Sequence, residues 1–324
     1  IDWNINKFNK LWAYNLNYFD YLGQEEISKE EGVILLKEFV KDYNKNLIGK
    51  DPYPSSLRII NWIKFLSKHE IDEDCYYRII KEDAERVYHN LEYHILGNHL
   101  LENGFALFFA ANLFKEKKYF KKSKEILKIN LDEQVLNDGA HFELSPMYHQ
   151  LMLLRVLDSI SLIRLNDNEL NSDLLSYLRS KASLMCSWLD QITFKSGEIP
   201  LVNDSANGIN PNTRTILSYA KSLDIDWKIT TLADSGYRMI RSKNYELFVD
   251  AGNIGPSYQP GHAHADTFNF ELYMNGVPCM VDTGTSTYDI GVRRAIERST
   301  NSHNTVSIKG INSSDVWSGF RVSK

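Results

Sequence analysis

The stretch Tyr237-Arg-Met-Ile-Arg-Ser-Lys-Asn-Tyr-Glu-Leu-Phe-Val-Asp250 decides the fold, because the pattern of the chain changes there. Apolar and polar residues alternate on both sides of a polar turn at Ser242–Asn244, as they do in half-buried strands. Residues 268–282 repeat this pattern around Asn275-Gly276, a favoured two-residue hairpin turn. The sequence therefore predicts an antiparallel sheet in this part of the chain.

Upstream of residue 233 the chain has a helical pattern instead. Apolar residues recur at three- and four-residue steps, as in Leu57, Ile60 and Ile63. Short segments with turn-forming residues, among them Asp51–Ser56 and Gly97–Asn98, are predicted to be loops between helices. Helices followed by strands predict two domains, a helical one at residues 1–232 and an antiparallel β domain at residues 233–324.

The sequence also predicts the architecture of the helical domain and an early end of the β domain. Many antiparallel helix pairs of this size predict a toroid or a solenoid. The helices carry no fixed-period sequence motif, which argues against repeat families with strong signatures. In the β part, His303–Ile308 and Trp317–Val322 are predicted as further strands, and the pattern breaks off at Lys324. We therefore expect the natural protein to continue beyond this residue.

Composition narrows the functional classes. The 324 residues carry a formal net charge of -5, which argues against a nucleic-acid-binding protein. An anionic substrate would have to be bound by a local basic cleft. Three cysteines without metal-site spacing indicate buried thiols, and no apolar run is long enough for a membrane span. The chain begins at Ile1 without a signal-peptide pattern.

The segment Gly261-His-Ala-His-Ala-Asp266 is the strongest local signal for chemistry. If it enters the sheet as a strand, His262 and His264 share a face and could bind a metal, or place a base beside one. Surface or structural histidines are the competing interpretation.

Two later segments add to this signal. Asp282 ends the next predicted strand and His303 begins another, so His264, Asp282 and His303 form a ligand set that zinc accepts, with Asp266 as an alternative carboxylate. The competing interpretation is that Asp282 caps a turn and His303 packs under a loop.

Two helix starts upstream carry polar residues. In Gly97–Gly104, the simpler interpretation makes Asn98 a helix N-cap and His99 a solvated residue. Tyr148 follows a proline in Asp138–Gln150, where a tyrosine usually belongs to a core or an interface. To act as a base it would need a pKa lowered from about 10 by an adjacent cation.

Taken in order, these motifs resemble the heparinase II/III-like family and the related alginate lyases. The resemblance runs from Leu11 to Trp317, nearly the whole chain. It implies an incomplete α/α toroid followed by an antiparallel β-sandwich, truncated at the C-terminus here, with the active site in the cleft between them. It also implies a bacterial lyase that cleaves a uronic-acid-containing, glycosaminoglycan-like polysaccharide or oligosaccharide by β-elimination.

The resemblance further implies roles for individual residues. The catalytic candidates are Asn98 and His99, which would neutralise the uronate carboxylate, and Tyr148 and His262, which would exchange protons with the substrate. The structural zinc ligands would be His264, Asp282 and His303, and no organic cofactor is expected. Candidates for substrate binding on weaker grounds are Arg58, Glu143, Arg214, Tyr288 and Arg298.

Other functions remain open from sequence alone. They are an alginate or capsular uronate lyase, an inert carbohydrate-binding relative, and a metal-dependent hydrolase, which would need an open metal site. We expect a periplasmic or secreted protein, and the lack of a visible signal peptide leaves a cytoplasmic location open.

Overall fold

The computed structural model describes residues 1–5, 7–166, 172–258 and 260–323. Its contacts divide the chain into two compact units, Ile1–Leu131 (unit 1) and Asp132–Lys324 (unit 2). Helices occupy all of unit 1 and the first part of unit 2, and strands begin at Tyr237. The predicted order of helices and then antiparallel strands is therefore confirmed, and the change of secondary structure near the predicted boundary at residue 232 lies inside unit 2.

Unit 1 is built from helices around an aromatic core. The helices are α1 (Lys10–Tyr18), α2 (Lys29–Asp42), α3 (Pro52–Lys68), α4 (Asp74–His89), α5 (Gly97–Phe114) and α6 (Lys117–Gln134), the last continuing into unit 2. Phe19, Phe39 and Trp62 meet edge to face with ring centroids 5.0–5.5 Å apart, and all three are fully buried. Such pairs stabilise a core beyond their buried area.

The two loops predicted in unit 1 are in fact helix starts. Pro52 opens α3 because its fixed φ suits the first helical turn, where its missing N–H costs nothing. Helix α5 begins at Gly97 behind Leu96, which has a positive φ of 62°. Asn98 therefore lies inside the helix, and its interpretation as the N-cap is wrong.

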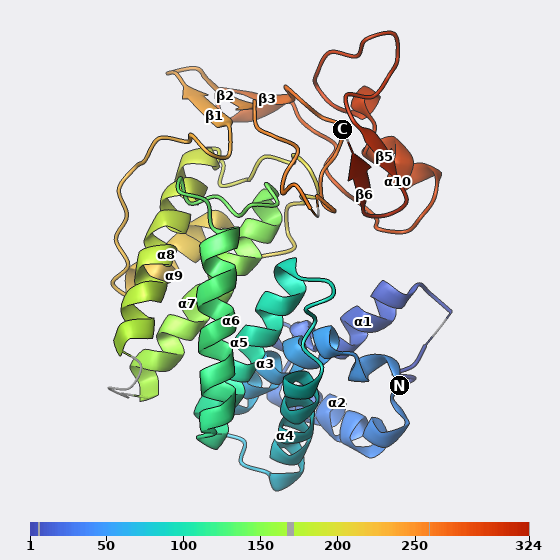
Figure 1. Ribbon diagram of the computed structural model, residues 1–324, viewed down its shortest axis with the longest axis vertical. Coiled ribbons are helices and arrows are strands. Elements are labelled where there is room, and N and C mark those ends of the chain that lie inside the picture. Colours follow the sequence, from blue (N-terminus) through green and yellow to red (C-terminus); the bar gives the residue numbers. More distant parts are fainter. Residues whose placement is uncertain (6, 167–171, 259, 324) are drawn as a thin grey trace. The chain divides into compact units, whose positions relative to one another are not determined.

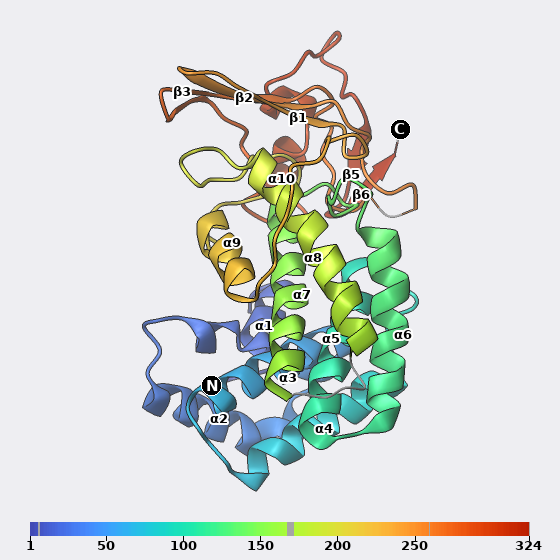
Figure 2. The ribbon, with the colours of Figure 1, turned by 90° about the vertical axis from the view of Figure 1, so that its left-hand side faces the viewer.

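Unit 2 places a sheet across the ends of two long helices (Figures 1 and 2). Its elements are α7 (Pro146–Asn166), α8 (Ser172–Ile192), α9 (Thr213–Ser222), β1 (Tyr237–Arg241), β2 (Tyr245–Asp250), β3 (Phe270–Met274), β4 (Val277–Met280), α10 (Val292–Glu297), β5 (Asp315–Trp317) and β6 (Arg321–Ser323). The core between helices and sheet contains Trp188 and Ile192 of α8 packed with Tyr237, Phe248 and Tyr273.

The strand order β1-β2-β3-β4 is antiparallel throughout, as the sequence predicts. The turn Asn275-Gly276 has positive φ at both residues, 54° and 80°, which explains the preference for Asn-Gly there. Two other predictions of strands, at residues 303–308 and 317–322, are wrong, and the histidine segment 261–266 does not enter the sheet. Residues 261–266 and 303–308 are irregular, and 317–322 is broken by a turn between β5 and β6.

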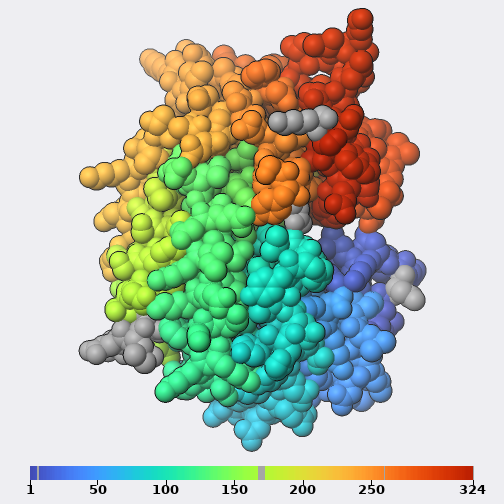
Figure 3. Space-filling model, in the orientation of Figure 1, coloured from blue at the N-terminus to red at the C-terminus, as the bar shows by residue number. Residues whose placement is uncertain are grey.

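The C-terminal part of unit 2, orange to red in Figure 3, leaves many apolar side chains exposed. They include Val277, Ile290, Val306, Ile308 and Trp317. No helix in the described ranges is long and apolar enough to cross a membrane.

Candidate active site

A buried aspartate that the sequence analysis did not single out joins the predicted histidines. Asp204 has no solvent exposure, and its carboxylate contacts His262 Nδ1 at 3.0 Å and His264 Nε2 at 2.9 Å. Arg294 adds a two-pronged contact, at 2.7 Å from Nη2 and a shorter one from Nη1. Burial alone would raise the pKa of Asp204, but hydrogen bonds from His262, His264 and Arg294 hold it well below its usual value.

His262 lies between two carboxylates. Its Nδ1 faces Asp204, and its Nε2 lies 3.6 Å from Glu143 Oε2. Burial disfavours the charged ring, but Glu143 and Asp204 outweigh burial and raise the pKa of His262. His262 and His264 thus point to the same carboxylate although their segment is not a strand. The backbone of the segment is tied to Asn203 and Asp204 instead, through His264 N to Asn203 Oδ1 and Asp204 N to His262 O.

Tyr148 packs directly on His262. The two ring centroids are 3.9 Å apart, so an imidazole lies against the phenol as the sequence argument required. The hydroxyl of Tyr148 lies 3.1 Å from the hydroxyl of Tyr288, whose ring stacks on Phe320. Phe320 also meets His262 edge to face. The structure therefore brings together Tyr148, His262, Glu143 and Tyr288 of the predicted residues.

The start of α7 is positioned by the same loop that carries Asp204. Ser145 caps this turn, because its hydroxyl accepts from Tyr148 N, donates to Asp204 O at 2.7 Å and lies 3.0 Å from Ser205 Oγ. Pro146 begins the helix, so Tyr148 stands in its first turn. This local arrangement fixes the phenol relative to His262.

The predicted metal ligands are neighbours, although no three of them form a closed site. His303 Nδ1 lies 2.7 Å from Asp282 Oδ2, and the rings of His264 and His303 are 5.3 Å apart. Asp282 also accepts from Gly284 N at 2.8 Å, so it does cap a turn. Within the described residues, no group of three or more His, Cys, Asp or Glu side chains is arranged to hold a metal ion.

Three buried polar atoms in this region nevertheless have no hydrogen-bond partner: His264 Nδ1, His303 Nε2 and Asp266 Oδ2. Burial raises the pKa of Asp266, and the nearby rings of His303 and His264 offset this shift only in part. Two imidazole nitrogens and one carboxylate oxygen are the donor types that zinc accepts. The residues present thus fit a zinc ion by donor chemistry, with Asp266 offering the uncommitted oxygen and Asp282 orienting His303.

Unit 1 holds the other two catalytic candidates. His99 stacks on Tyr53 with centroids 4.1 Å apart, and its Nδ1 lies 3.1 Å from Glu92 Oε1. Asn103 donates to the other oxygen of Glu92 at 2.9 Å. His99 is therefore held in one orientation at the start of α5 and is not a freely solvated residue. Asn98 precedes it and is half-buried.

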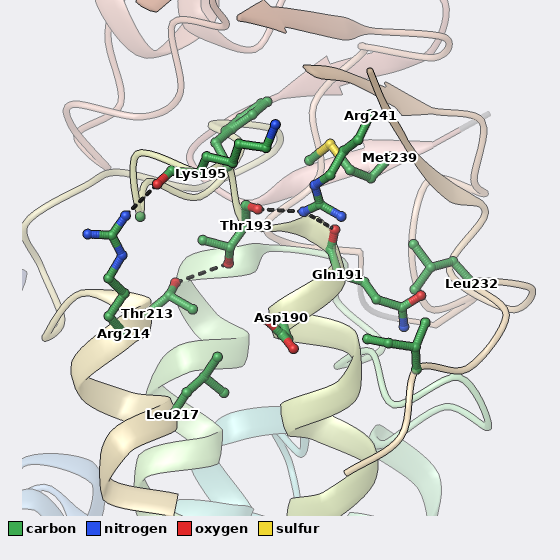
Figure 4. A pocket seen from close by; sticks show the side chains of 13 residues that line it. Asp190, Gln191, Thr193, Lys195, Thr213, Arg214, Leu217, Leu232, Met239 and Arg241 are labelled. Carbon is green, nitrogen blue, oxygen red and sulfur yellow. Dashed lines mark hydrogen bonds between the residues drawn. The ribbon is translucent and has the colours of Figure 1, made fainter. Parts of the chain in front are cut away.

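The three predicted substrate-binding arginines lie in different surroundings, and Arg298 adjoins the His262–His264 segment. Arg58 is 1% exposed and pairs with Asp83 inside unit 1, which argues against a direct contact with substrate. Arg298 is equally buried, donates to Ala263 O and Arg321 O, and has a pKa lowered to about 10 by burial. Arg214 lines a separate pocket in unit 2 (Figure 4).

Sequence reasoning missed Asp204, Arg294 and Phe320. Asp204 lies 58 residues before His262 and Arg294 lies 90 residues after Asp204 in the chain, so no local spacing connects them. The one available signal is chemical. Two histidines predicted on one face need an acidic partner, and Asp204 follows the apolar residues Leu201 and Val202.

Comparisons with known proteins identify the family of this chain. Residues 55–224 match the family model "Heparinase II/III N-terminus", and residues 225–324 match "Heparinase II/III-like, C-terminal". A heparin-sulfate lyase of Bacteroides stercoris is 24% identical over 262 residues, covering 69% of this chain and 38% of the relative.

Solved structures show the same fold. A heparinase III crystal structure matches 96% of this chain and 57% of its own with a TM-score of 0.72 at 16% identity. The heparan sulfate lyase HepC of Pedobacter heparinus matches 96% of this chain and 56% of its own with a TM-score of 0.60 at 19% identity. This chain thus spans under two thirds of the length of these relatives. The two family models together show that the chain belongs to the heparinase II/III-like family.

Proposed function

We propose that this protein is a polysaccharide lyase that cleaves a uronic-acid-containing, glycosaminoglycan-like polymer by β-elimination. The observation that carries the proposal is the Tyr148–His262 pair, with ring centroids 3.9 Å apart and His262 held by Asp204. A phenol and an imidazole in contact supply the two proton-transfer groups that such a reaction needs. Membership in the heparinase II/III-like family supports the same reaction class.

The proposed reaction removes the proton at C5 of a uronate and breaks the C4–O4 bond. The electron pair from the C–H bond forms the C4=C5 double bond, and the leaving oxygen takes up a proton. We assign the acid role to Tyr148, with the base role on one substrate face as well, and assign His262 the base role on the other face. Asp204 accepts from Nδ1, so the neutral ring would present Nε2 as its basic atom.

Charge on the substrate carboxylate opposes loss of the C5 proton, so a donor must stabilise the developing charge. We assign this role to Asn98 and His99 because of the motif that carries them. The Glu92–His99 contact at 3.1 Å supports a positioned imidazole there.

The test is an ultraviolet assay for the unsaturated uronate product on a panel of uronic acid polymers. We expect signal on glycosaminoglycan-type polymers and a loss of about 100-fold or more in Tyr148→Phe, the usual scale for removing an acid–base group. Tyr14→Phe, in another part of the chain, is the matched control and should keep activity. Full turnover by Tyr148→Phe would overturn the assignment, and incorporation of water into a saturated product would indicate a hydrolase instead.

We also propose a structural zinc ion held by His264, His303 and a carboxylate, Asp282 or Asp266. When bound, the ion would fix these ligands and so keep the adjacent His262 segment rigid. The three unpartnered buried atoms support this proposal. We expect about one zinc per chain by elemental analysis, lost in His303→Ala together with a lower Tm. His94→Ala, an exposed histidine, should change neither value. Metal-free protein whose Tm is unmoved by zinc would refute it.

A further inference from the structure

A pocket of about 640 Å³ lies in unit 2, and none of the proposed catalytic residues lines it (Figure 4). Its walls come from the end of α8, the loop after it, the start of α9, and β1. The volume is within the range of sites for small organic ligands. The lining residues are Asp190, Gln191, Thr193, Phe194, Lys195, Gly197, Thr213, Arg214, Leu217, Ile229, Leu232, Met239 and Arg241.

The pocket lies on the far side of α7 from the catalytic pair. Gln150 donates to Thr213, a pocket residue, at 3.1 Å. Gln150 follows Tyr148 by two positions on α7, and an α-helix turns by about 100° per residue, so these side chains leave the helix about 200° apart. The pocket is therefore distinct from the Tyr148–His262 site within the same unit.

The charge of the pocket is cationic, in contrast to the chain as a whole. Lys195, Arg214 and Arg241 line it, against the single carboxylate of Asp190. Asp190 is occupied by the indole N–H of Trp227 at 3.0 Å, and Arg241 pairs with Glu246 at 3.3 Å. Within the described residues, Lys195 and Arg214 have no carboxylate within ion-pair distance.

The two arginines are anchored on opposite sides of the pocket (Figure 4). Arg241 donates to Gln191 O at 2.8 Å and to Thr193 O at 2.7 Å, and Arg214 donates to Lys195 O at 2.5 Å. A guanidinium carries five N–H donors, so this backbone contact leaves Arg214 with further N–H groups for a ligand. Planar guanidinium groups pair well with carboxylate and sulfate oxygens.

The remaining wall is apolar. Leu217, Leu232 and Met239 add apolar side chains to its lining. A pyranose ring has a C–H face that packs on apolar side chains, while its acidic substituents need cations. We propose that this pocket is a second saccharide-binding site, which takes an acidic sugar unit carrying a carboxylate or a sulfate ester. This proposal rests on the proposed function, since the acidic polymer is the substrate class named there.

The test measures binding directly, in a Tyr148→Phe background so that no turnover occurs. Calorimetric titration with a heparan sulfate tetrasaccharide should report two classes of site. In Lys195→Ala/Arg214→Ala the Kd of the second class of site should rise about ten-fold or more, which is the scale expected for lost charge-assisted contacts. The control Lys121→Ala/Lys243→Ala removes two exposed lysines outside the pocket and should titrate like the parent. Equal titration by both double variants overturns the proposal.

Two further experiments, a competition with sulfate and a kinetic comparison, distinguish a saccharide site from a simple anion site and from a failure of the proposed function. Sodium sulfate at the concentration of the sugar should not displace the tetrasaccharide, and full displacement would mean a simple anion site. With Tyr148 intact, the pocket variant should raise KM for polymer, whereas the control double variant should not. An unchanged KM for polymer overturns the saccharide site. Absence of any lyase product would instead refute the proposed function, while the calorimetric result would still decide the pocket.

Discussion

At the scale of single residues, Asp204 is the group on which the site depends. A fully buried carboxylate is costly to desolvate, and it persists here because three donors, His262, His264 and Arg294, surround it. The same contacts fix which nitrogen of His262 faces away from the carboxylate. Asp204 is thus a positioning residue that acts through His262, and it links that ring to His264.

Replacing Asp204 with Asn should therefore impair turnover more than binding. The amide keeps the shape but loses the charge that orients His262, so we expect kcat to fall about 100-fold, with KM changed by less than about three-fold. Buried Arg294 also loses its partner, which should cost about 3 kcal/mol of stability. Steady-state kinetics and urea unfolding check both effects.

A second variant separates the catalytic effect from the loss of stability. Asp204→Asn/Arg294→Gln restores the charge balance of the buried cluster, so part of the stability should return while kcat stays low. If kcat recovers together with stability, Asp204 has only a structural role.

The sequence could predict single residues only where a motif carried them. Tyr148, His262 and Tyr288 were predicted and are neighbours in unit 2. Asp204 and Arg294 were not, because they meet across 90 residues of chain and each stands in a segment of ordinary composition. The ion pair of Arg58 with Asp83 was unpredictable for a related reason, since a helical arginine looks the same in sequence whether it faces solvent or a buried carboxylate.

At the scale of elements, local patterns predicted well where side chains alternate regularly. Strands β1 to β3 form where the alternation predicts them, and Asn275-Gly276 forms the expected turn, although β3 buries Glu271 and Tyr273 and not the apolar residues that alternate with them. The segment 261–266 failed as a strand because its backbone is bound to the Asn203–Asp204 segment, which no local pattern reveals. The segment 317–322 failed because Ser318, with a φ of 55°, turns the chain.

A pair of buried histidines connects the loop before α7 to α7 and α8. His141 N donates to His149 Nδ1 at 3.2 Å, and His149 Nε2 lies 3.1 Å from Met185 O. These contacts require neutral His149, with its proton on Nε2. Burial lowers the pKa of both His141 and His149 to about 3.

This pair should make the protein sensitive to mild acid. In the unfolded chain a histidine titrates near 6.5, so between pH 6.5 and pH 3 the unfolded state binds more protons and stability falls as the pH falls. Each histidine should contribute up to about 1.4 kcal/mol per pH unit over this range. Urea unfolding at pH 7.5, 6.5 and 5.5 measures the slope.

His149→Gln is the matched variant, because its amide keeps one acceptor and one donor without a titrating group. Below pH 6.5 the free energy of unfolding of the variant should fall less steeply than that of the parent. The two slopes should differ by up to about 1.4 kcal/mol per pH unit. An identical slope in the variant and the parent would mean that His149 is not the group that takes up the proton.

At the scale of the whole molecule, net charge and proposed substrate have the same sign. The chain carries -5, yet the proposed polymer is anionic, so the long-range field should repel it. Cations confined to local sites, such as Lys195 and Arg214, must provide the attraction at short range. The repulsion by the net charge acts over a longer range than the attraction by these local cations, so added salt weakens the repulsion first.

This difference predicts a maximum in activity with ionic strength. Raising salt from about 10 mM to about 100 mM shortens the Debye length from about 30 Å to about 10 Å, which removes repulsion while close contacts persist. We therefore expect kcat/KM on polymer to rise over this range and to fall at higher salt. Lys195→Ala/Arg214→Ala makes the chain more negative by two charges and should steepen the initial rise. A steady fall of kcat/KM from the lowest salt would show instead that a basic field dominates the approach, and the charge balance of the chain would then have no part in how it meets its polymer.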